Sequence, residues 1–291
     1  DIAPGEPGEA MILHSPTSNP YFDTWVAVLD LATMTVLADR ELPQHGGLID
    51  YDPAGNRLFL GSTNLSPSSL SRLSYAPASR TFALDQYRWN AGGGGSDLSL
   101  SPDGSRLAFA DGSGNGSDYA IHDLVASNLD SRRGRWKTGP YPRAVGFRHD
   151  GLKVIATSYD SLIEFDAGRH VVERSWPMDS SDDPVCSYTG HVGPQRAKYS
   201  PSGRFAYSTY PCDSAGYYSV VDMVALGNPT PPSSPPAVPA TGLAFTCSTE
   251  DPGALPAQTP VRLPVEPVND IVPACHGRVV LAASGSNRVV S

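Results

Sequence analysis

The sequence contains no apolar run long enough to cross a bilayer, so we expect no membrane span. It is also poor in basic residues, with a formal net charge of −9. Binding to duplex phosphates depends on a basic surface, so this balance predicts no nucleic-acid partner. The one basic cluster, residues 132–137, is interpreted as a solvated strand edge, where charge discourages pairing with another sheet.

Common catalytic motifs are absent as well. There is no Gly-x-Ser-x-Gly nucleophile elbow, no phosphate-binding loop and no dinucleotide fingerprint. The seven histidines are spread singly along the chain, and no pair has a metal-binding spacing within one strand or turn. We therefore expect no catalytic residues and no cofactor, apart from the calcium ion considered below.

Cysteine is missing from the N-terminal half, and no Cys-x-x-Cys pair of the zinc or redox kind occurs anywhere. The chain has an even number of cysteines, Cys186, Cys212, Cys247 and Cys275. We therefore expect two disulfides and, with them, an oxidising compartment. The start at Asp1, without an apolar signal region, agrees with a processed chain that is secreted, periplasmic or located at the cell surface.

What the sequence does contain is a repeated turn that is followed at once by a β-rich segment. The turn glycines stand at positions 55, 104, 151, 203 and 277, so the steps are 49, 47, 52 and 74 residues. In the copy that begins Ser101-Pro-Asp-Gly-Ser-Arg, proline presets φ and the Asp-Gly pair supplies the positive φ of a tight hairpin. A period of about 50 residues is the size of one propeller blade.

Each copy also has an apolar-alternating segment before the turn and two further short strands after it, as expected of a four-stranded antiparallel meander. Stacking such sheets around an axis buries their faces against one another. The sequence therefore predicts an all-β fold, a β-propeller of six or seven four-stranded antiparallel blades, as a single domain over residues 1–291. We expect the chain to open at the second strand of a blade, at residues 10–14. Either the 74-residue step then hides an extra blade, or the chain is a fragment of a longer polypeptide.

The repeat has a recognisable form. The segment Trp25-Val-Ala-Val-Leu-Asp-Leu-Ala-Thr-Met-Thr-Val, followed later by Ser101-Pro-Asp-Gly-Ser-Arg-Leu-Ala-Phe-Ala, resembles the YVTN-type β-propeller repeat. Lactonase-like propellers and propellers like the amine-dehydrogenase heavy chain share this repeat, and the similarity covers most of residues 10–225. The resemblance implies the fold and leaves the function open, because propellers include enzymes, ligand binders and scaffolds.

Two features of the C-terminal half follow from the blade pattern. The Pro-rich residues 227–240 predict an extended surface loop inserted within a blade, since prolines cannot form a strand ladder. Cys186 and Cys212 fall in loops on one face of the predicted disc, and Cys247 and Cys275 fall in loops on the other. This placement predicts the disulfides Cys186–Cys212 and Cys247–Cys275.

The first strand of each blade should line a central channel, so the residues that begin these strands should meet at one mouth. The polar candidates for ligand binding there are His45, Asp97, Arg143, His191, Gln195, Arg196, Asn269 and Asp270. Two arginines facing acids and amides can hold a carboxylate or phosphate through bidentate hydrogen bonds. We favour the alternative, in which these side chains satisfy one another and buried waters around the channel.

One turn partly imitates a calcium loop. Asp111, Ser113 and Asn115 place oxygen ligands at alternate positions, with Gly116 for a sharp turn. The acidic residue that would close such a site is missing, since His122 occupies its position. A plain Gly-rich hairpin turn is therefore favoured, and calcium binding is the alternative.

These observations favour an exported, non-catalytic propeller that binds a protein partner or a surface polymer as a module of a larger extracellular or cell-envelope assembly. The resemblance implies an enzymatic alternative, a lactonase-like hydrolase or an amine-dehydrogenase heavy-chain-like subunit. A lactonase would use acid, base and cation-binding residues at the channel mouth, drawn from His45, Asp97, Arg143 and His191. A third hypothesis is a carbohydrate-binding propeller whose aromatic side chains stack on sugars, with candidates Tyr87, Trp89, Trp136 and Tyr141.

Overall fold

The computed structural model describes residues 1–15, 23–63, 67–112, 120–158, 161–177, 196–200, 202–212, 215–223, 258–262, 268–273, 279–283 and 288–290. All regular elements in these ranges are β-strands. The same ranges contain no helix with the length and apolar character needed to span a membrane.

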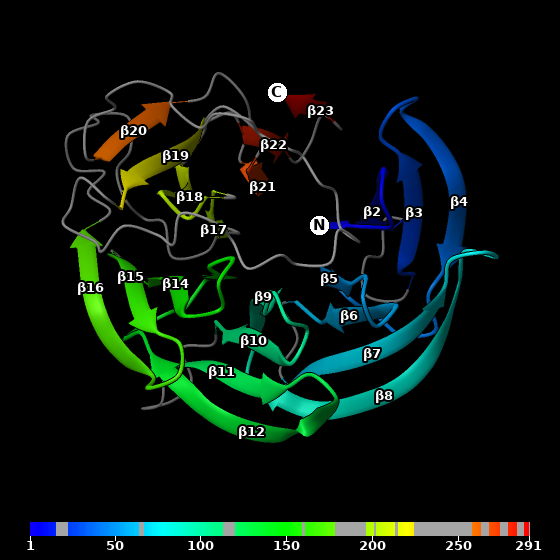
Figure 1. The fold of residues 1–291 in the computed structure, drawn as a ribbon, viewed down its shortest axis with the longest axis horizontal. Helices are drawn as coiled ribbons and strands as arrows, with labels where there is room; N and C mark the ends of the chain where they lie inside the picture. Colours follow the sequence, from blue (N-terminus) through cyan, green and yellow to red (C-terminus); the bar gives the residue numbers. More distant parts are fainter. Residues whose placement is uncertain are drawn as a thin grey trace.

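The strands form six antiparallel sheets within the described residues, and each sheet is one blade (Figure 1). Blade 1 contains β1 (Ile2–Pro4), β2 (Glu9–His14), β3 (Trp25–Asp30) and β4 (Thr35–Glu41). Blade 2 contains β5 (Leu48–Asp52), β6 (Arg57–Gly61), β7 (Ser68–Ala76) and β8 (Thr81–Gly92). Blade 3 contains β9 (Gly95–Leu100), β10 (Arg106–Asp111), β11 (Ala120–Val125) and β12 (Asn128–Lys137).

The remaining three blades continue the series. Blade 4 contains β13 (Ala144–Phe147), β14 (Lys153–Ser158), β15 (Ser161–Asp166) and β16 (Val171–Pro177). Blade 5 contains β17 (Arg196–Tyr199), β18 (Phe205–Cys212), β19 (Ala215–Asp222) and β20 (Gln258–Arg262). Blade 6 contains β21 (Val268–Pro273), β22 (Val279–Ala283) and β23 (Arg288–Val290).

The prediction of an all-β propeller is confirmed. Figure 1 shows the blades following one another around a common axis, with the first strand of each blade near the centre and the fourth at the periphery. The first strands of successive blades contact one another from β1 to β21. Six blades within the described residues agree with the lower of the two predicted numbers.

The expectation that the chain opens at the second strand of a blade is wrong. Residues Ile2–Pro4 form β1, the inner strand of blade 1, and Ile2 lies opposite Ile12 of β2. Strand β1 has only three residues and ends in proline. It is therefore too short to show the alternation of apolar residues by which a strand is recognised in a sequence.

Four of the five repeated turns form as the sequence predicts, and the fifth, with Gly277, is outside the described residues. Gly104, Gly151 and Gly203 have φ values of 67°, 70° and 72°. Each of their amides donates a 2.8 Å hydrogen bond to the carbonyl three residues earlier. In blade 2 the positive φ falls on Asn56 instead of Gly55, and asparagine is one of the few other residues that adopts this conformation readily.

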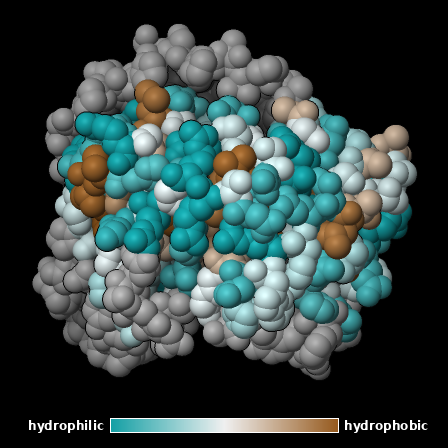
Figure 2. All heavy atoms as spheres, turned by 90° about the horizontal axis from the view of Figure 1, so that it is seen from below, coloured by the Kyte–Doolittle hydropathy of each residue, from teal (hydrophilic) through white to brown (hydrophobic). Residues whose placement is uncertain are grey.

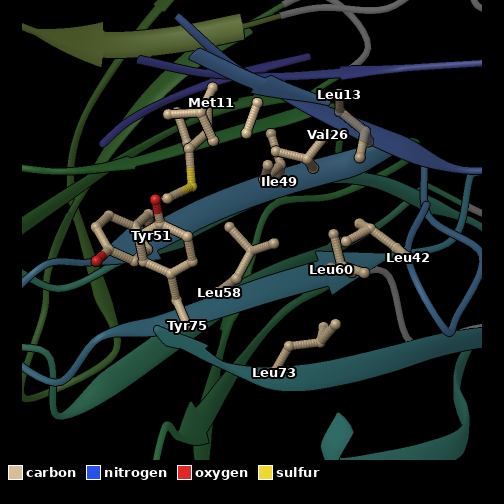
Figure 3. Packing of buried hydrophobic residues seen from close by; sticks show 13 residues of the cluster. Met11, Leu13, Val26, Leu42, Ile49, Tyr51, Leu58, Leu60, Leu73 and Tyr75 are labelled. Atoms are coloured by element: carbon tan, nitrogen blue, oxygen red, sulfur yellow. The ribbon is translucent and has the colours of Figure 1, made fainter. Parts of the chain in front are cut away.

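The hydrophobic core lies between neighbouring blades. Figure 3 shows the cluster between blades 1 and 2, where Met11 and Val26 of blade 1 pack with Leu58 and Leu73 of blade 2. Similar clusters join blades 2 and 3, blades 3 and 4, and blades 4 and 5. Blades 2, 3 and 4 therefore depend on a neighbour on each side to bury their two faces, which is the physical reason for the radial arrangement.

Candidate functional site at the channel and its entrance

An inner-strand carboxylate, Asp97, links two blades. It lies in β9 and is almost completely buried. Its Oδ1 accepts a hydrogen bond of 2.9 Å from the Leu98 amide of its own strand, and its Oδ2 accepts one of 2.8 Å from the Val145 amide of β13. The candidate acid of the channel mouth therefore uses both oxygens to hold blades 3 and 4 together.

The same arrangement, a carboxylate in or directly before an inner strand that accepts one amide hydrogen bond from that strand and one from the next blade, recurs in two other blades. Asp50 of β5 accepts a 2.8 Å bond from the next amide in its strand and a 2.7 Å bond from the Leu100 amide of blade 3. Asp1 accepts a 3.1 Å bond from the next amide and a 2.9 Å bond from the Ile49 amide of blade 2. A ladder of carboxylates thus joins the inner strands of blades 1 to 4, each acid bonding the strand that follows it around the axis.

The channel also brings together charges from distant blades. Asp50 keeps some contact with solvent but is enclosed by protein, and burial is the main cause that raises the pKa of its carboxyl group above the ordinary value. The negative charge of Asp97 raises this pKa further, while the positive charge of Lys198 in blade 5 and the two amide hydrogen bonds act to lower it. Blades 2, 3 and 5 therefore contribute interacting charges to the axis.

The role of Asp97 can be tested by substitution. We expect Asp97→Ala to lower the free energy of unfolding by about 1–3 kcal/mol, because the buried Val145 amide loses its acceptor. Asp97→Asn should have a smaller effect, since the amide oxygen can still accept one of the two bonds. Urea unfolding followed by tryptophan fluorescence measures both. Unchanged stability in the alanine variant would contradict a linking role.

The other predicted residues of the channel mouth have different surroundings. His45 is exposed in the segment before β5. Arg143 lies just before β13, and its guanidinium stands 5.6 Å from the ring centre of Tyr141. It also approaches Gly112, the residue that follows β10, so that a Cβ added there would lie 3.2 Å from its Nη1. Arg196 begins β17, Asn269 and Asp270 lie in β21, and His191 and Gln195 are outside the described residues.

Near Arg143, the structure places together two residues that the sequence did not pair. His122 of β11 has its Nε2 3.7 Å from Oδ2 of Asp111 at the end of β10. The imidazole also stacks on Phe109, with ring centres 6.4 Å apart. This pair follows from the hairpin between β10 and β11, whose strand register brings the two residues onto one face. Asp111, His122 and Arg143 are thus three ionisable groups that the described residues place in this part of the entrance.

The Asp111 carboxylate is already a hydrogen-bond acceptor for the neighbouring backbone. It accepts hydrogen bonds of 3.0 Å from the amides of Gly93 and Gly94. Ser113 and Asn115, the other predicted calcium ligands, are outside the described residues. The described part of the chain contains no group of three His, Cys, Asp or Glu side chains placed to hold a metal ion. Calcium binding stays a prediction, and an unchanged melting temperature on calcium addition would contradict it.

The other predictions for the C-terminal half also fall largely outside the described residues. Cys212 ends β18, whereas Cys186, Cys247 and Cys275 lie in segments that the structure does not describe. The two disulfide pairings therefore stay predictions. The Pro-rich residues 227–240 lie, in chain order, between β19 and β20 and are also outside the described ranges.

A buried carboxylate that sequence reasoning missed, Asp123, joins blades 3 and 4 away from the axis. It is fully buried and accepts hydrogen bonds from Arg106 at 3.1 and 2.7 Å, and its Oδ2 lies 2.8 Å from Nε2 of His170 in blade 4. Arg106 also lies over the ring of Trp136, 5.3 Å from its centre. The group is an ion-pair network enclosed by aromatic side chains.

Glu164 occupies the corresponding position in blade 4. It is fully buried, binds the guanidinium of Arg174 in its own blade, and accepts a 2.7 Å hydrogen bond from the hydroxyl of Tyr199 in blade 5. Burial, followed by the charge of Glu164, raises the pKa of the Tyr199 hydroxyl well above its usual value. The two acids have the same position in the strand register. The first residue of the second strand pairs with Val125 in blade 3 and with Asp166 in blade 4, and the buried acid stands two residues before that partner. This signal can be recognised only once the register is known.

Comparison with known proteins supports the fold and goes no further. No protein-family model and no curated protein matches the chain. Among solved structures, hydrazine synthase of Kuenenia stuttgartiensis is similar with a TM-score of 0.60 and 14% identity, over 99% of this chain and 74% of that one. A protein from Lactobacillus plantarum is similar with a TM-score of 0.54 and 16% identity, over 77% of this chain and 67% of that one. At such identities the likeness establishes a β-propeller-type fold alone.

Proposed function

We propose that this chain is an exported, non-catalytic propeller that binds a protein partner or a surface polymer within a larger extracellular or cell-envelope assembly. The observation that carries the proposal is the state of Asp97, the acid that sequence reasoning placed at the channel mouth. Both of its oxygens accept backbone hydrogen bonds in a buried setting, so it is not poised to exchange a proton with a substrate.

The periphery supports the same proposal. The outer strands expose large side chains, among them Val36 of β4, Trp89 of β8 and Val172 of β16, with exposures of 60%, 64% and 52%. Exposed aromatic and aliphatic side chains at accessible strands are suited to contact with another molecule. The expected disulfides, which favour an oxidising compartment, support export.

The test is to isolate the protein from its native source under mild conditions, with chemical cross-linking, and to determine its mass and composition. The proposal expects a defined partner chain or polymer bound in a reproducible ratio. An isolated monomer that turns over a substrate would contradict it.

An enzymatic function has one observation in its favour, the placement of Asp111, His122 and Arg143 at the entrance. A lactonase-like hydrolase would use such an acid–base pair beside a cation. Assaying a panel of lactones with the wild-type chain and with His122→Gln distinguishes a hydrolase from a non-catalytic binding protein. Hydrolysis that is lost in the variant, with its melting temperature retained, would favour the enzyme. An amine-dehydrogenase-like subunit would instead co-purify with a cofactor-bearing chain.

A further inference from the structure

Two outer strands lie side by side at the junction of blades 2 and 3, at the lower rim in Figure 1. The Arg88 guanidinium of β8 donates a hydrogen bond to the Leu129 carbonyl of β12. The Leu129 amide in turn donates a 3.1 Å hydrogen bond to Oε1 of Gln86. We call this junction of β8 and β12 the β8–β12 rim.

Basic side chains gather on one side of this rim. Arg132 lies opposite Leu124 of β11, which belongs to the core between blades 2 and 3, so Arg132 is on the face turned towards blade 2. Arg135 and Lys137 pair with the next alternate residues of β11 and therefore share that face. Arg88 meets them from blade 2. Burial lowers the pKa of its guanidinium, and the charge of Arg132 lowers it further, which indicates that the two cations are close.

Much of this positive charge is not neutralised locally. Arg132, Arg133 and Lys137 are exposed and make no ion pair with any residue that the structure describes. Two acids are nearby. Asp130 lies near Arg88, and Asp85 is already bound at 2.6 Å to an arginine of β7. The rim is thus a basic strip on a chain whose net charge is −9.

An aromatic pair stands on the same strand as Arg88. Tyr87 and Trp89 are 40% and 64% exposed, and their ring centres are 6.5 Å apart. Alternation along β8 puts them on the face opposite to Arg88. Because β8 is the outermost strand of its sheet, a ligand lying along its edge can touch both faces. Aromatic rings with polar tips offer a flat apolar surface, and a sugar ring is a partly polar ligand that can stack on such a surface.

The surroundings argue against an apolar protein interface. Figure 2 looks onto the lower rim of Figure 1 and shows a mainly hydrophilic surface, on which the hydrophobic areas are small and separate. Protein interfaces usually have a contiguous, weakly charged centre. Strand addition by a peptide is also disfavoured, because two register shifts between β11 and β12 interrupt the regular geometry of β12.

We propose that the β8–β12 rim binds an acidic polysaccharide. Sugar rings stack on Tyr87 and Trp89, and carboxylates along the polymer pair with Arg132 and the neighbouring cations. Guanidinium groups suit this ligand because they bind carboxylates through two parallel hydrogen bonds. The inference rests on the proposed binding function and deepens it by naming the chemistry of the partner.

The test measures binding of polygalacturonate by isothermal titration calorimetry, with neutral dextran as the comparison ligand. We expect polygalacturonate to bind and dextran not to bind. Affinity should fall as salt is raised from about 50 mM to about 300 mM, since counter-ions screen exposed charges. Arg132→Glu should weaken binding at least about tenfold, because an attraction becomes a repulsion. Trp89→Ala should weaken it by a similar factor through loss of the stacking surface.

Matched controls come from β4, the corresponding outer strand of blade 1. Arg40→Glu makes the same change of net charge at an exposed site, and Val36→Ala removes an exposed apolar side chain. Both should change the dissociation constant less than about twofold. If Arg132→Glu and Arg40→Glu weakened polygalacturonate binding equally, the effect would come from the net charge of the protein and not from this rim, and the inference would be overturned. The inference would also be overturned if polygalacturonate did not bind at low salt. It would likewise be overturned if poly-glutamate bound as tightly as polygalacturonate and Trp89→Ala did not weaken that binding.

Failure of this inference can be told apart from failure of the proposed function. If the partner isolated with the native protein is retained equally by wild-type chain and Arg132→Glu, the binding function stands and the assignment to this rim is wrong. If the native protein is a monomer with catalytic turnover, the proposed function itself is wrong.

Discussion

An Asp123→Ala variant is expected to unfold with a free energy about 3–5 kcal/mol lower than that of the wild-type chain. The substitution leaves the guanidinium of Arg106 buried between blades 3 and 4 without the carboxylate that neutralises it. It also removes the partner of His170 in blade 4, so the hydrogen bonds that remain between the two blades at this point include the one from Arg106 to the Ala167 carbonyl but not the one to His170. Urea unfolding at neutral pH measures the change.

The control for this variant is a carboxylate at a more exposed ion pair. Asp85 binds Arg72 at 2.6 Å but its side chain is 44% exposed, so Asp85→Ala should cost under about 1 kcal/mol. Asp123→Asn is the second variant, because it keeps the volume of the side chain and removes the charge. Should Asp123→Ala and Asp85→Ala have equal effects, the buried network would not be a main support of the junction between blades 3 and 4.

Gly146→Ala is expected to destabilise the chain by about 3 kcal/mol. Gly146 lies in β13, where a Cβ would come under 3.0 Å from the carbonyl oxygen of Ala197 in β17. The atom in the way belongs to the backbone of the neighbouring inner strand, so it cannot move without shifting blade 5 away from blade 4. A lower urea midpoint, with the β-sheet circular dichroism spectrum retained, is the expected result.

Gly168→Ala serves as the matched control. Gly168 is exposed in the hairpin before β16, and a Cβ there would meet only the Asp166 Oδ1 at 3.7 Å. Its effect should stay within about 1 kcal/mol and favour the folded state, because alanine restricts the unfolded chain. If Gly146→Ala were as well tolerated, the inner strands would have room to adjust, and close contact around the axis would not limit the sequence of β13.

Most of the fold was predictable because its signals are local. The Pro-Asp-Gly type of turn before β10 and the apolar alternation around it act within a few residues, and they recur in neighbouring copies. The strand that was missed, β1, has three residues and no alternation to detect. The exposed aromatic pair of β8 was identified as a carbohydrate-stacking candidate from its residue types, but the approach of Arg132 to Arg88 on the opposite face of that strand required the arrangement of two blades.

The candidate site was much less predictable. Sequence reasoning placed Asp97 and Arg143 at the channel mouth, and the described structure puts both at the junction of blades 3 and 4. It did not foresee that the Asp97 carboxylate bonds an amide 48 residues away, because that partner is set by the stagger between two inner strands. Asp123 and Glu164 were missed for the same reason, since an acid in a strand reads as a surface residue until the next blade covers it.

The amino-acid order alone dictates the strands, their turns and the repeat of about 50 residues, because these depend on backbone preferences and on periodicity over short distances. The arrangement of the blades around the axis decides everything that involves two repeats. It determines which carboxylates are buried as links between blades, which cations are left exposed along the β8–β12 rim, and which ionisable groups meet at the entrance. The physical reason is that each of these outcomes depends on the distance and register between sheets, and neighbouring residues along the chain do not specify either one.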